Sequence, residues 1–382
     1  MTLGIVLQVL FWISIAVILW AYVGYFLATW LMSRIYPKPV HKENWFPQVS
    51  LIITAYNEAS RIGKKIGNSL DLEYPRDKLE IIVVSDASTD ATESIVKTFA
   101  DQGVKLLAIP VRHGKHYAQG RGIQAAVSDI VVLTDATTYL EKDALSKIIR
   151  SYADPTVGCV SGEDRVDSPD GDVVGEGAYV KYEMKLRSFE NLAGSLVGAS
   201  GCFFSVRKSL CSAWIDDMSS DFYIPIVARM NGLRAVVDHE AIGNYRVVSD
   251  HSKEFGRKVR TVVHGLEVLF RFRRIMNPFK YGGYAIQMIS HKLCRWLVPF
   301  AMIIALVTNA LLAAHCTFFQ VILAVQVIMY LLALAAYIIP PLQKSGPFKI
   351  PLFFVLVNLS VLVAWYKYLT GYKYVVWDAT KR

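Results

Sequence analysis

Two apolar segments of the chain each end in an aspartate. Residues 81–85 precede Asp86, and residues 130–134 precede Asp135. In an open parallel α/β sheet, ligands bind beyond the carboxyl ends of the strands. A carboxylate at such a place can accept hydrogen bonds from a ribose or a base, or bind a metal ion that holds a diphosphate. Asp86 and Asp135 are therefore the first candidates for a ligand site.

The region 47–250 alternates between apolar runs and helical patterns. Strands are predicted at residues 49–55, 79–85, 104–109 and 130–134, and helices at residues 58–70, from about 90, and at 115–127. This alternation is typical of an α/β fold with a mostly parallel sheet. No G-x-G-x-x-G follows the first strand and no G-x-x-x-x-G-K-[ST] occurs, which disfavours dinucleotide and P-loop chemistry.

The composition indicates a membrane protein. The 382 residues are 53% hydrophobic, and the apolar excess lies at the two ends of the chain. A formal charge of +9 is compatible with nucleic acid, anionic lipid or phosphate-rich ligands. The apolar ends favour the membrane surface, so no nucleic-acid partner is expected. Five scattered cysteines without a C-x-x-C pair predict reduced thiols rather than a zinc site or a disulfide framework.

The first apolar run, residues 5–31, carries no charge and exceeds the ~20 residues that a bilayer core requires. It lacks the basic start and cleavage site of a signal peptide, so we expect a membrane anchor. Arg34, Lys38 and Lys42 follow it, which places the next residues in the cytoplasm. No predicted span carries a buried charge of the kind that marks an ion path, which disfavours a transporter.

Three further apolar runs, residues 297–314, 318–339 and 351–365, lie near the C-terminus. If the last one spans, the tail with Lys373, Lys381 and Arg382 lies outside the cell, against the positive-inside tendency. If it lies in the interface, the tail stays in the cytoplasm. Four spans are preferred over three, and the side of the C-terminus stays open.

Two later segments have amphipathic helical patterns. The stripe within residues 179–196 fits either the sheet or the lipid interface. The stripe within residues 255–269 lies among arginines and lysines with little acidic compensation, which favours the lipid interface.

A series of short motifs runs through the predicted α/β region. In order they are Thr54-Ala55-Tyr56-Asn57-Glu58, Ser85-Asp86-Ala87-Ser88-Thr89-Asp90, His113-Gly114-Lys115, Asp135-Ala136-Thr137, Gly198-Ala199-Ser200-Gly201-Cys202, Ser219-Ser220-Asp221 and Arg257-Lys258-Val259-Arg260-Thr261. Each motif is weak by itself. In this order and spacing, residues 47–299 resemble the membrane-integrated family 2 glycosyltransferases of the GT-A fold, the branch of hyaluronan, cellulose and poly-N-acetylglucosamine synthases.

The resemblance implies a role for each motif. It implies that Asp86 contacts the nucleoside, that Asp135 and Thr137 lie at a Mg or Mn site, and that Asp221 is the catalytic base of an inverting transfer. The other residues expected to bind the nucleotide-sugar are Tyr56, Glu58, Lys115, Arg257 and Arg260. The acceptor-side turn is expected at Ser200, Gly201 and Cys202.

Structural roles are the alternatives for several of these residues. Asp86 can cap the following helix, and Glu58 can be a first-turn helix charge. Lys115 can belong to a solvated basic turn. Asp216, Asp217 and Asp221 can form a solvated acidic loop.

Two residues depart from the family pattern. Thr137 replaces the second aspartate of the metal motif, and a neutral hydroxyl is a weaker ligand than a carboxylate. Thr261 replaces the tryptophan of processive members, which offers a stacking platform for a sugar ring. These departures keep metal identity and processivity open.

The favoured function is transfer of a sugar from a nucleotide-sugar, expected to be a UDP-sugar, to a growing polysaccharide. The alternatives are transfer of one sugar to a lipid carrier or glycolipid, and an inactive nucleotide-sugar-binding membrane module. We expect a multi-pass protein of the plasma or inner membrane, with its catalytic domain in the cytoplasm and in contact with membrane lipids. A secretion channel of so few spans would require a second copy of the chain or a partner protein.

The expected domains follow from these patterns. They are an N-terminal anchor (1–33), a GT-A domain (34–250), amphipathic interfacial helices (251–295), and C-terminal transmembrane segments with a short tail (296–382).

Overall fold

The computed structural model describes residues 2–166, 176–245, 251–372 and 374. At its centre is an eight-stranded sheet in the order β3-β2-β1-β4-β7-β6-β8-β5. The strands are β1 (Val49–Ala55), β2 (Leu79–Asp86), β3 (Val104–Ile109), β4 (Ile130–Asp135), β5 (Thr138–Leu140), β6 (Val157–Val166), β7 (Phe203–Arg207) and β8 (Arg234–Tyr245). The first four strands in this order are parallel, as predicted.

Beyond β4 the sheet becomes mixed. β7 runs antiparallel to both of its neighbours, β4 and β6, while β6 and β8 run parallel to one another. The short β5 closes the edge antiparallel to β8. The GT-A-like sheet is thus a parallel half extended by a mixed half, and the ends of β4 and β6 lie near the change in direction.

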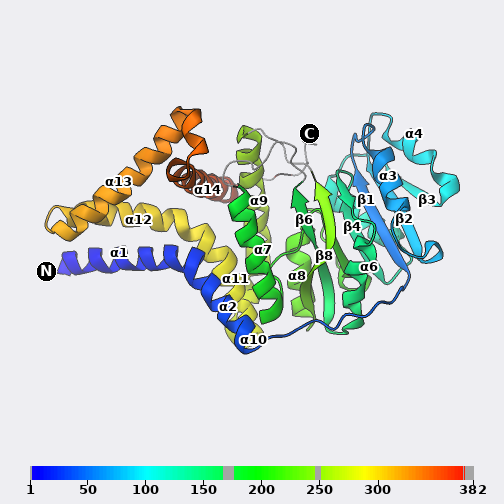
Figure 1. The fold of residues 1–382 in the computed structure, drawn as a ribbon, viewed down its shortest axis with the longest axis horizontal. Helices are drawn as coiled ribbons and strands as arrows, with labels where there is room; N and C mark the ends of the chain where they lie inside the picture. Colours follow the sequence, from blue (N-terminus) through cyan, green and yellow to red (C-terminus); the bar gives the residue numbers. More distant parts are fainter. Residues whose placement is uncertain (1, 167–175, 246–250, 373, 375–382) are drawn as a thin grey trace.

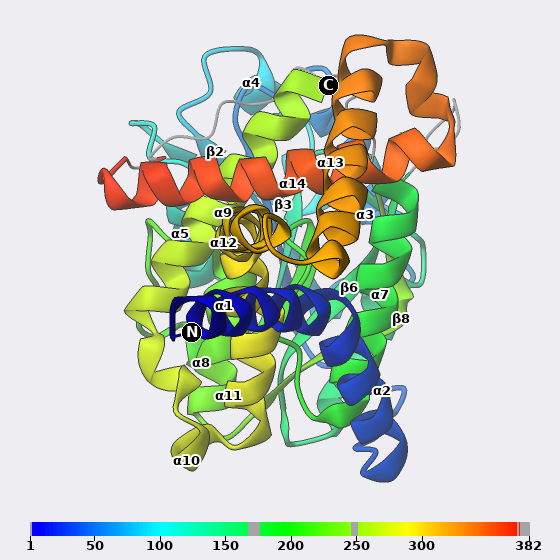
Figure 2. The same cartoon turned by 90° about the vertical axis from the view of Figure 1, so that its left-hand side faces the viewer.

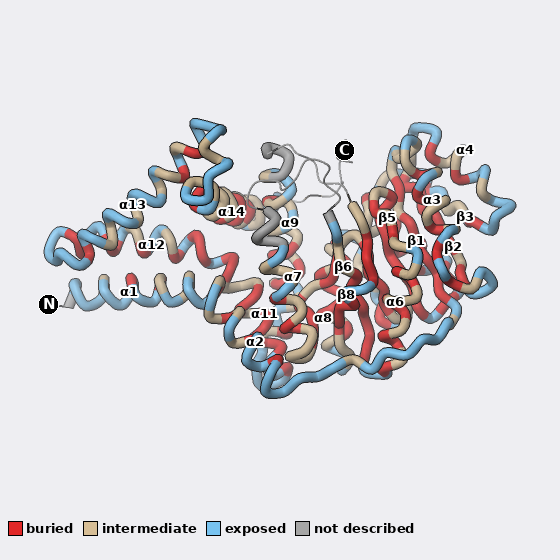
Figure 3. Tube along the Cα trace, in the orientation of Figure 1, coloured by how far each residue is buried: buried red, intermediate tan, exposed pale blue. Residues whose placement is uncertain are grey.

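The apolar runs form strands that are buried on both faces, because helices cover both sides of the sheet (Figures 1 and 3). Alternate residues of β1 face opposite cores, with Ile52 in one and Leu51 and Ile53 in the other. The helices of the first core include α5 (Lys115–Ala125) and α8 (Ser220–Met230). The helices of the second core are α3 (Ile62–Leu70), α4 (Thr92–Lys97) and α6 (Ala144–Arg150).

The first two predicted helices begin later than the sequence pattern indicated. α3 starts at Ile62 instead of residue 58 because the chain forms a turn first, with Asn57 at a φ of 53°. The N–H of Glu58 in this turn donates to Thr92 Oγ1 at 2.9 Å. α4 starts at Thr92, whose N–H donates to Asp90 Oδ1 at 3.0 Å. The two turns after β1 and β2 are therefore tied together.

Two long helices lie between the sheet and the apolar helices (Figure 1). They are α7 (Glu176–Ala193) and α9 (His251–Arg271), and both were predicted as amphipathic segments. In α9 the stripe residues Val259, Leu266 and Leu269 are buried. α7 packs against α2, and α9 packs against α14.

Among the described residues, four helical stretches are long and apolar enough to cross a membrane: Leu3–Ile35, Gly283–Ala313, Thr317–Ile338 and Gly346–Leu369. Their elements are α1 (Thr2–Leu19), η1 (Trp20–Gly24), α2 (Tyr25–Ile35), α11 (Gly283–Met288), η7 (Ile289–Cys294), α12 (Arg295–Ala313), α13 (Thr317–Ile338) and α14 (Gly346–Leu369), and the short α10 (Pro278–Tyr281) precedes the second stretch. The second stretch begins 14 residues before the predicted span at 297, since Gly283 starts it. It therefore includes basic residues that the sequence analysis left outside.

The last apolar helix crosses the others instead of running beside them. α14 is seen along its axis in Figure 1 and from the side in Figure 2, whereas α12 runs lengthwise in Figure 1. The tail residues Lys373, Lys381 and Arg382 lie outside the described residues. The side of the membrane on which the C-terminus lies therefore stays a prediction.

The turn after β2 contains a strained residue. Ala87 has a φ of 58°, in the left-handed region, where the resembled family pattern has glycine. A side chain in this region costs roughly 1–2 kcal/mol relative to the ordinary helical region. Ala87 precedes Ser88, whose hydroxyl accepts from the N–H of Asn57 at 3.1 Å. The strain thus lies in the contact between the two strand-end turns.

We predict that Ala87→Gly stabilises the protein by up to about 1 kcal/mol, because the relief of strain exceeds the entropy that glycine adds to the unfolded chain. Thermal midpoints in detergent measure the effect. Ala91→Gly is the matched control, because Ala91 has a φ of −73° and gains nothing from glycine. An Ala87→Gly midpoint at or below that of the wild type would show that the turn is not strained.

Candidate active site

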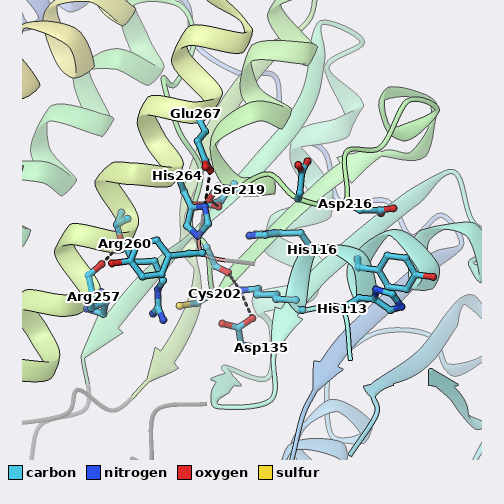
Figure 4. A pocket seen from close by; sticks show the side chains of 18 of the residues that line it. His113, His116, Asp135, Cys202, Asp216, Ser219, Arg257, Arg260, His264 and Glu267 are labelled. Atoms are coloured by element: carbon cyan, nitrogen blue, oxygen red, sulfur yellow. Dashed lines mark hydrogen bonds and ion pairs between the residues drawn. The ribbon is translucent and has the colours of Figure 1, made fainter. Parts of the chain in front are cut away.

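A cavity of about 570 Å³ opens at the carboxyl ends of the central strands. Its lining comes from the start of α5, the ends of β4, β6 and β8, the turns before β7 and α8, and one face of α9. Figure 4 shows side chains from these elements, including Asp135, His264 and Arg260, directed into the same space. Segments distant in sequence therefore share one site.

The link between Lys115 and Asp135 lies at the floor of this cavity. Asp135 is the last residue of β4 and is 7% exposed. The Lys115 ammonium lies 2.5 Å from Asp135 Oδ1 and donates to the carbonyl oxygen of Gly201 at 2.7 Å. Burial alone would lower the pKa of Lys115, but Asp135 and other nearby acidic groups outweigh it and raise the pKa. The lysine is therefore a fixed positive charge.

Asp221 lies in the first turn of α8, where the helix dipole favours a carboxylate. Ser219 Oγ donates to its Oδ1 at 2.6 Å. A β-carbon built on Gly201 would lie 3.4 Å from the other carboxylate oxygen, so the turn at Gly201 passes directly beside Asp221. Gly201 thus contacts Asp221 on one side and the Lys115 ammonium on the other.

The turn predicted on the acceptor side is held by the Ser200 hydroxyl and by a backbone hydrogen bond to β4. Ser200 Oγ accepts from the N–H groups of Cys202 and Phe203, both at 3.1 Å. The carbonyl of Cys202 accepts from the N–H of Asp135 at 3.2 Å. Gly201 and Cys202 line the cavity. The structure therefore brings this turn beside both Asp135 and Asp221.

Asp164 is a third acidic residue of the cavity, and the sequence analysis missed it. Its carboxylate accepts from Ser200 Oγ at 2.6 Å. Burial, reinforced by the charges of Asp135 and Asp221, raises the pKa of Asp164 to about 6. The signal was available, because Asp164 lies towards the end of β6, as Asp135 lies at the end of β4.

The predicted nucleoside residues lie beside the cavity, and its lining does not include them. Asp86 is buried, and its two carboxylate oxygens accept from the N–H groups of His113 at 2.9 Å and Gly114 at 2.7 Å. The Arg112 guanidinium lies 3.8 Å from the Tyr56 ring centre. Glu58 pairs with Arg61 at 3.2 Å. Asp86 therefore fixes the loop that precedes Lys115, whether or not it contacts a nucleoside.

α9 contributes one wall of the cavity. Arg257 and Arg260 both line it, as the sequence analysis expected from residues one turn apart. Thr261 also lines it, with its hydroxyl donating to the carbonyl of Arg257 at 2.9 Å. His264 was missed in the sequence analysis, and it pairs with Glu267 at 3.2 Å. This wall is therefore polar as well as basic.

Two further basic residues near the site were also missed. Burial lowers the pKa of His116 to about 4, and the charge of Lys115 acts in the same direction, so the imidazole is neutral at physiological pH. Burial lowers the pKa of Lys65 to about 7, against the pull of Asp135. Lys65 lies in α3 and donates to Thr134 Oγ1 at 3.2 Å. Neither residue carried a sequence signal, because each acts through tertiary contacts.

Thr137 lies in the turn between β4 and β5, and the cavity lining does not include it. Among the described residues, no group of three His, Cys, Asp or Glu side chains could hold a metal ion. Mg and Mn accept one or two carboxylates when phosphate oxygens complete the shell. The carboxylate of Asp135 is already paired with the Lys115 ammonium, so a divalent metal beside it would need the negative charge of a diphosphate as well.

We predict that Asp164→Asn changes the pH dependence of stability. A native pKa of about 6 exceeds the ~3.9 of an unfolded aspartate, so the ionised residue destabilises the fold above pH ~6. This penalty fades as the pH falls from about 6 towards 4, because only the native state takes up the proton. The variant should therefore be more stable than the wild type at pH ~7.5, by roughly 1–2 kcal/mol after allowance for solvent screening.

Thermal midpoints of both proteins between pH ~7.5 and ~5 measure the difference, in which the titration of all other groups cancels. A difference that is equal or larger at the lower pH would contradict the raised pKa of Asp164.

The chain is similar to known glycosyltransferases in sequence and in structure. Residues 50–214 match the family described as Glycosyl transferase family 2. A poly-beta-1,6-N-acetyl-D-glucosamine synthase of Staphylococcus aureus is 28% identical over 232 residues, which cover 58% of this chain and 56% of the synthase. The synthase of Staphylococcus epidermidis is 28% identical over 181 residues, which cover 45% and 43%. The chain thus spans about half the length of these curated relatives.

Among solved structures, the fold resembles a mannosyltransferase from Pyrobaculum calidifontis in complex with GDP-Man and Mn²⁺. The TM-score is 0.73 at 25% identity, and the match covers 95% of this chain and 99% of the other. The likeness therefore includes the apolar helices as well as the sheet. Together these findings confirm the sequence resemblance: the chain carries a glycosyltransferase family 2 domain with the GT-A fold.

Proposed function

We propose that the protein is a membrane-bound inverting glycosyltransferase that transfers a sugar from a nucleotide-sugar to a growing polysaccharide. The observation that carries the proposal is the turn at Gly201, which has the Lys115–Asp135 pair on one side and the Asp221 carboxylate on the other. A cationic site for the leaving diphosphate and a base for the acceptor hydroxyl are thereby next to each other. The family 2 domain and the two synthase relatives support this function.

The donor is bound by its diphosphate and its nucleoside. Lys115, Arg257 and Arg260 supply positive charge around the cavity for the diphosphate. Tyr56, Glu58 and Asp86 lie on the nucleoside side, where Asp86 also fixes the loop before Lys115. A UDP-sugar is the donor proposed from the family resemblance. The mannosyltransferase neighbour is in complex with GDP-Man. A UDP-sugar and GDP-Man both contain a nucleoside diphosphate, so the proposed contacts to the diphosphate suit either donor.

Asp135 would bind the metal, with Thr137 available from the adjoining turn. Bound there, Mn or Mg would neutralise the charge that develops on the departing diphosphate. The Mn²⁺ in the mannosyltransferase neighbour supports a divalent ion. With one carboxylate and one hydroxyl from the protein, the diphosphate oxygens must supply a larger part of the coordination than in family members with two aspartates.

Asp221 takes the proton from the acceptor hydroxyl, which attacks the anomeric carbon opposite the leaving group. Inversion follows, so an α-linked donor gives a β-linked product. Ser219 orients the carboxylate through its hydrogen bond. Ser200, Gly201 and Cys202 form the acceptor turn, with Gly201 leaving the carboxylate uncovered on that side.

The proposed arrangement keeps the expected domains: an anchor (1–33), a cytoplasmic catalytic domain (34–250), interfacial helices (251–295) and C-terminal spans (296–382). The four apolar helices support membrane association. Residence in the plasma or inner membrane with the catalytic domain in the cytoplasm fits a nucleotide-sugar donor, which is a cytoplasmic metabolite.

Transfer of a single sugar to a lipid carrier or glycolipid is the second candidate. Thr261 faces the cavity where processive members have a tryptophan, so the stacking platform for a polymer is absent from this position. The mannosyltransferase neighbour matches 95% of the chain, more than the synthase relatives do. An inactive module is disfavoured because Asp135, Lys115 and Asp221 form an intact constellation.

We predict that Asp221→Asn lowers the turnover number at least ~100-fold, the usual contribution of a general base, while donor affinity changes little. Release of nucleoside diphosphate measures turnover, and calorimetry with the donor measures affinity. Asp101→Asn is the matched control, with the same change in charge at an exposed position outside the cavity lining. Wild-type turnover in Asp221→Asn would refute the assignment of the base.

Product length separates the two candidates. With a radiolabelled nucleotide-sugar, polysaccharide synthesis predicts a ladder or a polymer, and single transfer predicts one lipid-soluble product. A panel of nucleotide-sugars assayed for nucleoside diphosphate release identifies the donor for this experiment.

A further inference from the structure

The last apolar helix, α14, packs along α9, which forms one wall of the active site. At one end of the contact, the Lys258 ammonium lies 4.8 Å from the ring centre of Phe353. At the other end, the rings of Phe270 and Tyr368 are stacked with their centres 5.5 Å apart. Lys258 and Phe270 are 12 positions apart, so the contact extends over roughly 18 Å of α9.

α9 is bound to the catalytic domain and lies outside the hydrocarbon layer of a membrane. Arg257 and Arg260 line the cavity from this helix, and a charged side chain at the centre of a bilayer costs at least ~2.5 kcal/mol. Val263 of α9 and Ala364 of α14 are buried together in the middle of the contact. Because α14 follows α9 over most of its length, α14 lies at the border between the catalytic domain and the lipid.

α14 is also oriented crosswise to α12. Figure 1 shows α12 lengthwise, while the same view looks along the axis of α14, which Figure 2 shows from the side. α1 packs against α12, and both extend away from the sheet (Figure 1). Membrane-spanning helices are tilted by roughly 0–40° from the membrane normal. With the normal along α1 and α12, α14 lies in the plane of the membrane.

A cluster around His291 fixes the start of α12 on the side of the catalytic domain. His291 Nδ1 lies 2.6 Å from Glu190 Oε1, and its Nε2 lies 3.3 Å from Glu183 Oε2. Arg295, the first residue of α12, pairs with the same Glu183. Both glutamates belong to α7, which packs against β8 of the sheet. α12 therefore begins beside the catalytic domain.

α13 returns the chain to the same side. α12 leads away from the sheet, and α13 begins at the far end of α12 (Figure 1). There the ring centre of Phe319 in α13 lies 5.4 Å from that of Phe11 in α1. One crossing by α12 and one by α13 bring the chain back to the catalytic side before α14 begins at Gly346.

The residues after α14 reach the active site. Tyr374 lines the cavity, and its ring centre lies 6.0 Å from that of His264 on α9. The Lys367 ammonium, in the last turn of α14, donates to Tyr374 Oη at 2.7 Å. α14 ends at Leu369, and a chain from there to Tyr374 reaches at most ~17 Å, too short for a bilayer core of ~30 Å. Both ends of α14 therefore lie on the catalytic side.

The outer face of α14 is apolar and aromatic. Leu359, Tyr366 and Leu369 are exposed, and their spacing of seven and then three residues places them on one face of the helix. Val361 and Ala364, on the opposite face, are buried. A helix with an apolar outer face suits the boundary between lipid headgroups and acyl chains, where tyrosine is also favoured.

We propose that α14 lies in the membrane surface on the catalytic side, with its outer face in the lipid interface and its inner face against the active-site wall. Of the four candidate spans, Leu3–Ile35, Gly283–Ala313 and Thr317–Ile338 then cross the bilayer, and α14 does not. Lys349 and Lys367, near the two ends of α14, both lie on the side proposed to be cytoplasmic, in agreement with the positive-inside tendency.

The depths of two labelled positions test the orientation of α14. Full-length protein with Leu359→Cys or Leu369→Cys is spin-labelled in phosphatidylcholine vesicles, and collisions with oxygen and with a water-soluble relaxing agent give the depth of each label. The signal of the parent protein, labelled at its native cysteines, is subtracted. An interfacial helix predicts depths within roughly 5 Å of one another, whereas a span predicts a difference of roughly 10–15 Å.

Val321→Cys and Leu331→Cys are the matched control pair, because they are exposed positions of α13 with the same spacing. Their depths should differ by roughly 10–15 Å, since α13 crosses the bilayer. A difference for the α14 pair as large as that for the α13 pair would overturn the proposal.

Labelling with a membrane-impermeant maleimide tests the side on which α14 ends. Native Cys316, exposed between α12 and α13, marks the opposite side, and Asp101→Cys, exposed in the catalytic domain, marks the catalytic side. In sealed vesicles of known orientation, Thr370→Cys should be labelled together with Asp101→Cys, as identified by peptide mass spectrometry. Labelling of Thr370→Cys together with Cys316 would show that α14 crosses the membrane. Neither experiment requires turnover, so failure of the proposed function would leave both results standing.

Discussion

The ion pair between Lys115 and Asp135 is the interaction on which the rest of the site depends. One ammonium group joins the end of β4, the start of α5 and the carbonyl of Gly201. Asp86 fixes the loop that delivers Lys115, and the turn at Gly201 passes beside Asp221. Charge, donor loop and base are thereby held in one arrangement.

The membrane part is joined to this arrangement by polar contacts rather than by apolar packing alone. The cluster around His291 fixes α7 to both the first and the second apolar helix. α7 and the turn at Gly198 then connect those helices to the acceptor side of the cavity. The turn at Gly198, next to Asp221, therefore lies beside Lys292 of the second apolar stretch.

Much of the parallel half of the sheet could be predicted, because its strands are short apolar runs that end at polar residues. The same rule identified Asp86 and Asp135, and motif order added Asp221, Arg257 and Arg260. The mixed half was not predicted, since β5 has only three residues and long segments with α7 and α8 separate β6, β7 and β8. Asp164 obeys the strand-end rule, but its strand belongs to that half. Lys65, His116 and His264 depend on tertiary contacts that no local pattern encodes.

The start of the second apolar helix also escaped prediction. A charge-free window begins near residue 297, yet the helix starts at Gly283, and Glu183 compensates the charge of Arg295 within it. A prediction from hydropathy alone ends a span at such residues. The basic residues that end the predicted span therefore lie inside the observed helix.

We propose that Asp135 holds a divalent metal together with the donor diphosphate. Calorimetric titration of Mn²⁺ into the wild type and Asp135→Asn, each with and without a nucleoside diphosphate, tests it most directly. We expect tight Mn²⁺ binding only when the diphosphate is present, and at least ~10-fold weaker binding in the variant. Equal Mn²⁺ affinity in both proteins, or tight binding by the wild type without the diphosphate, would contradict it.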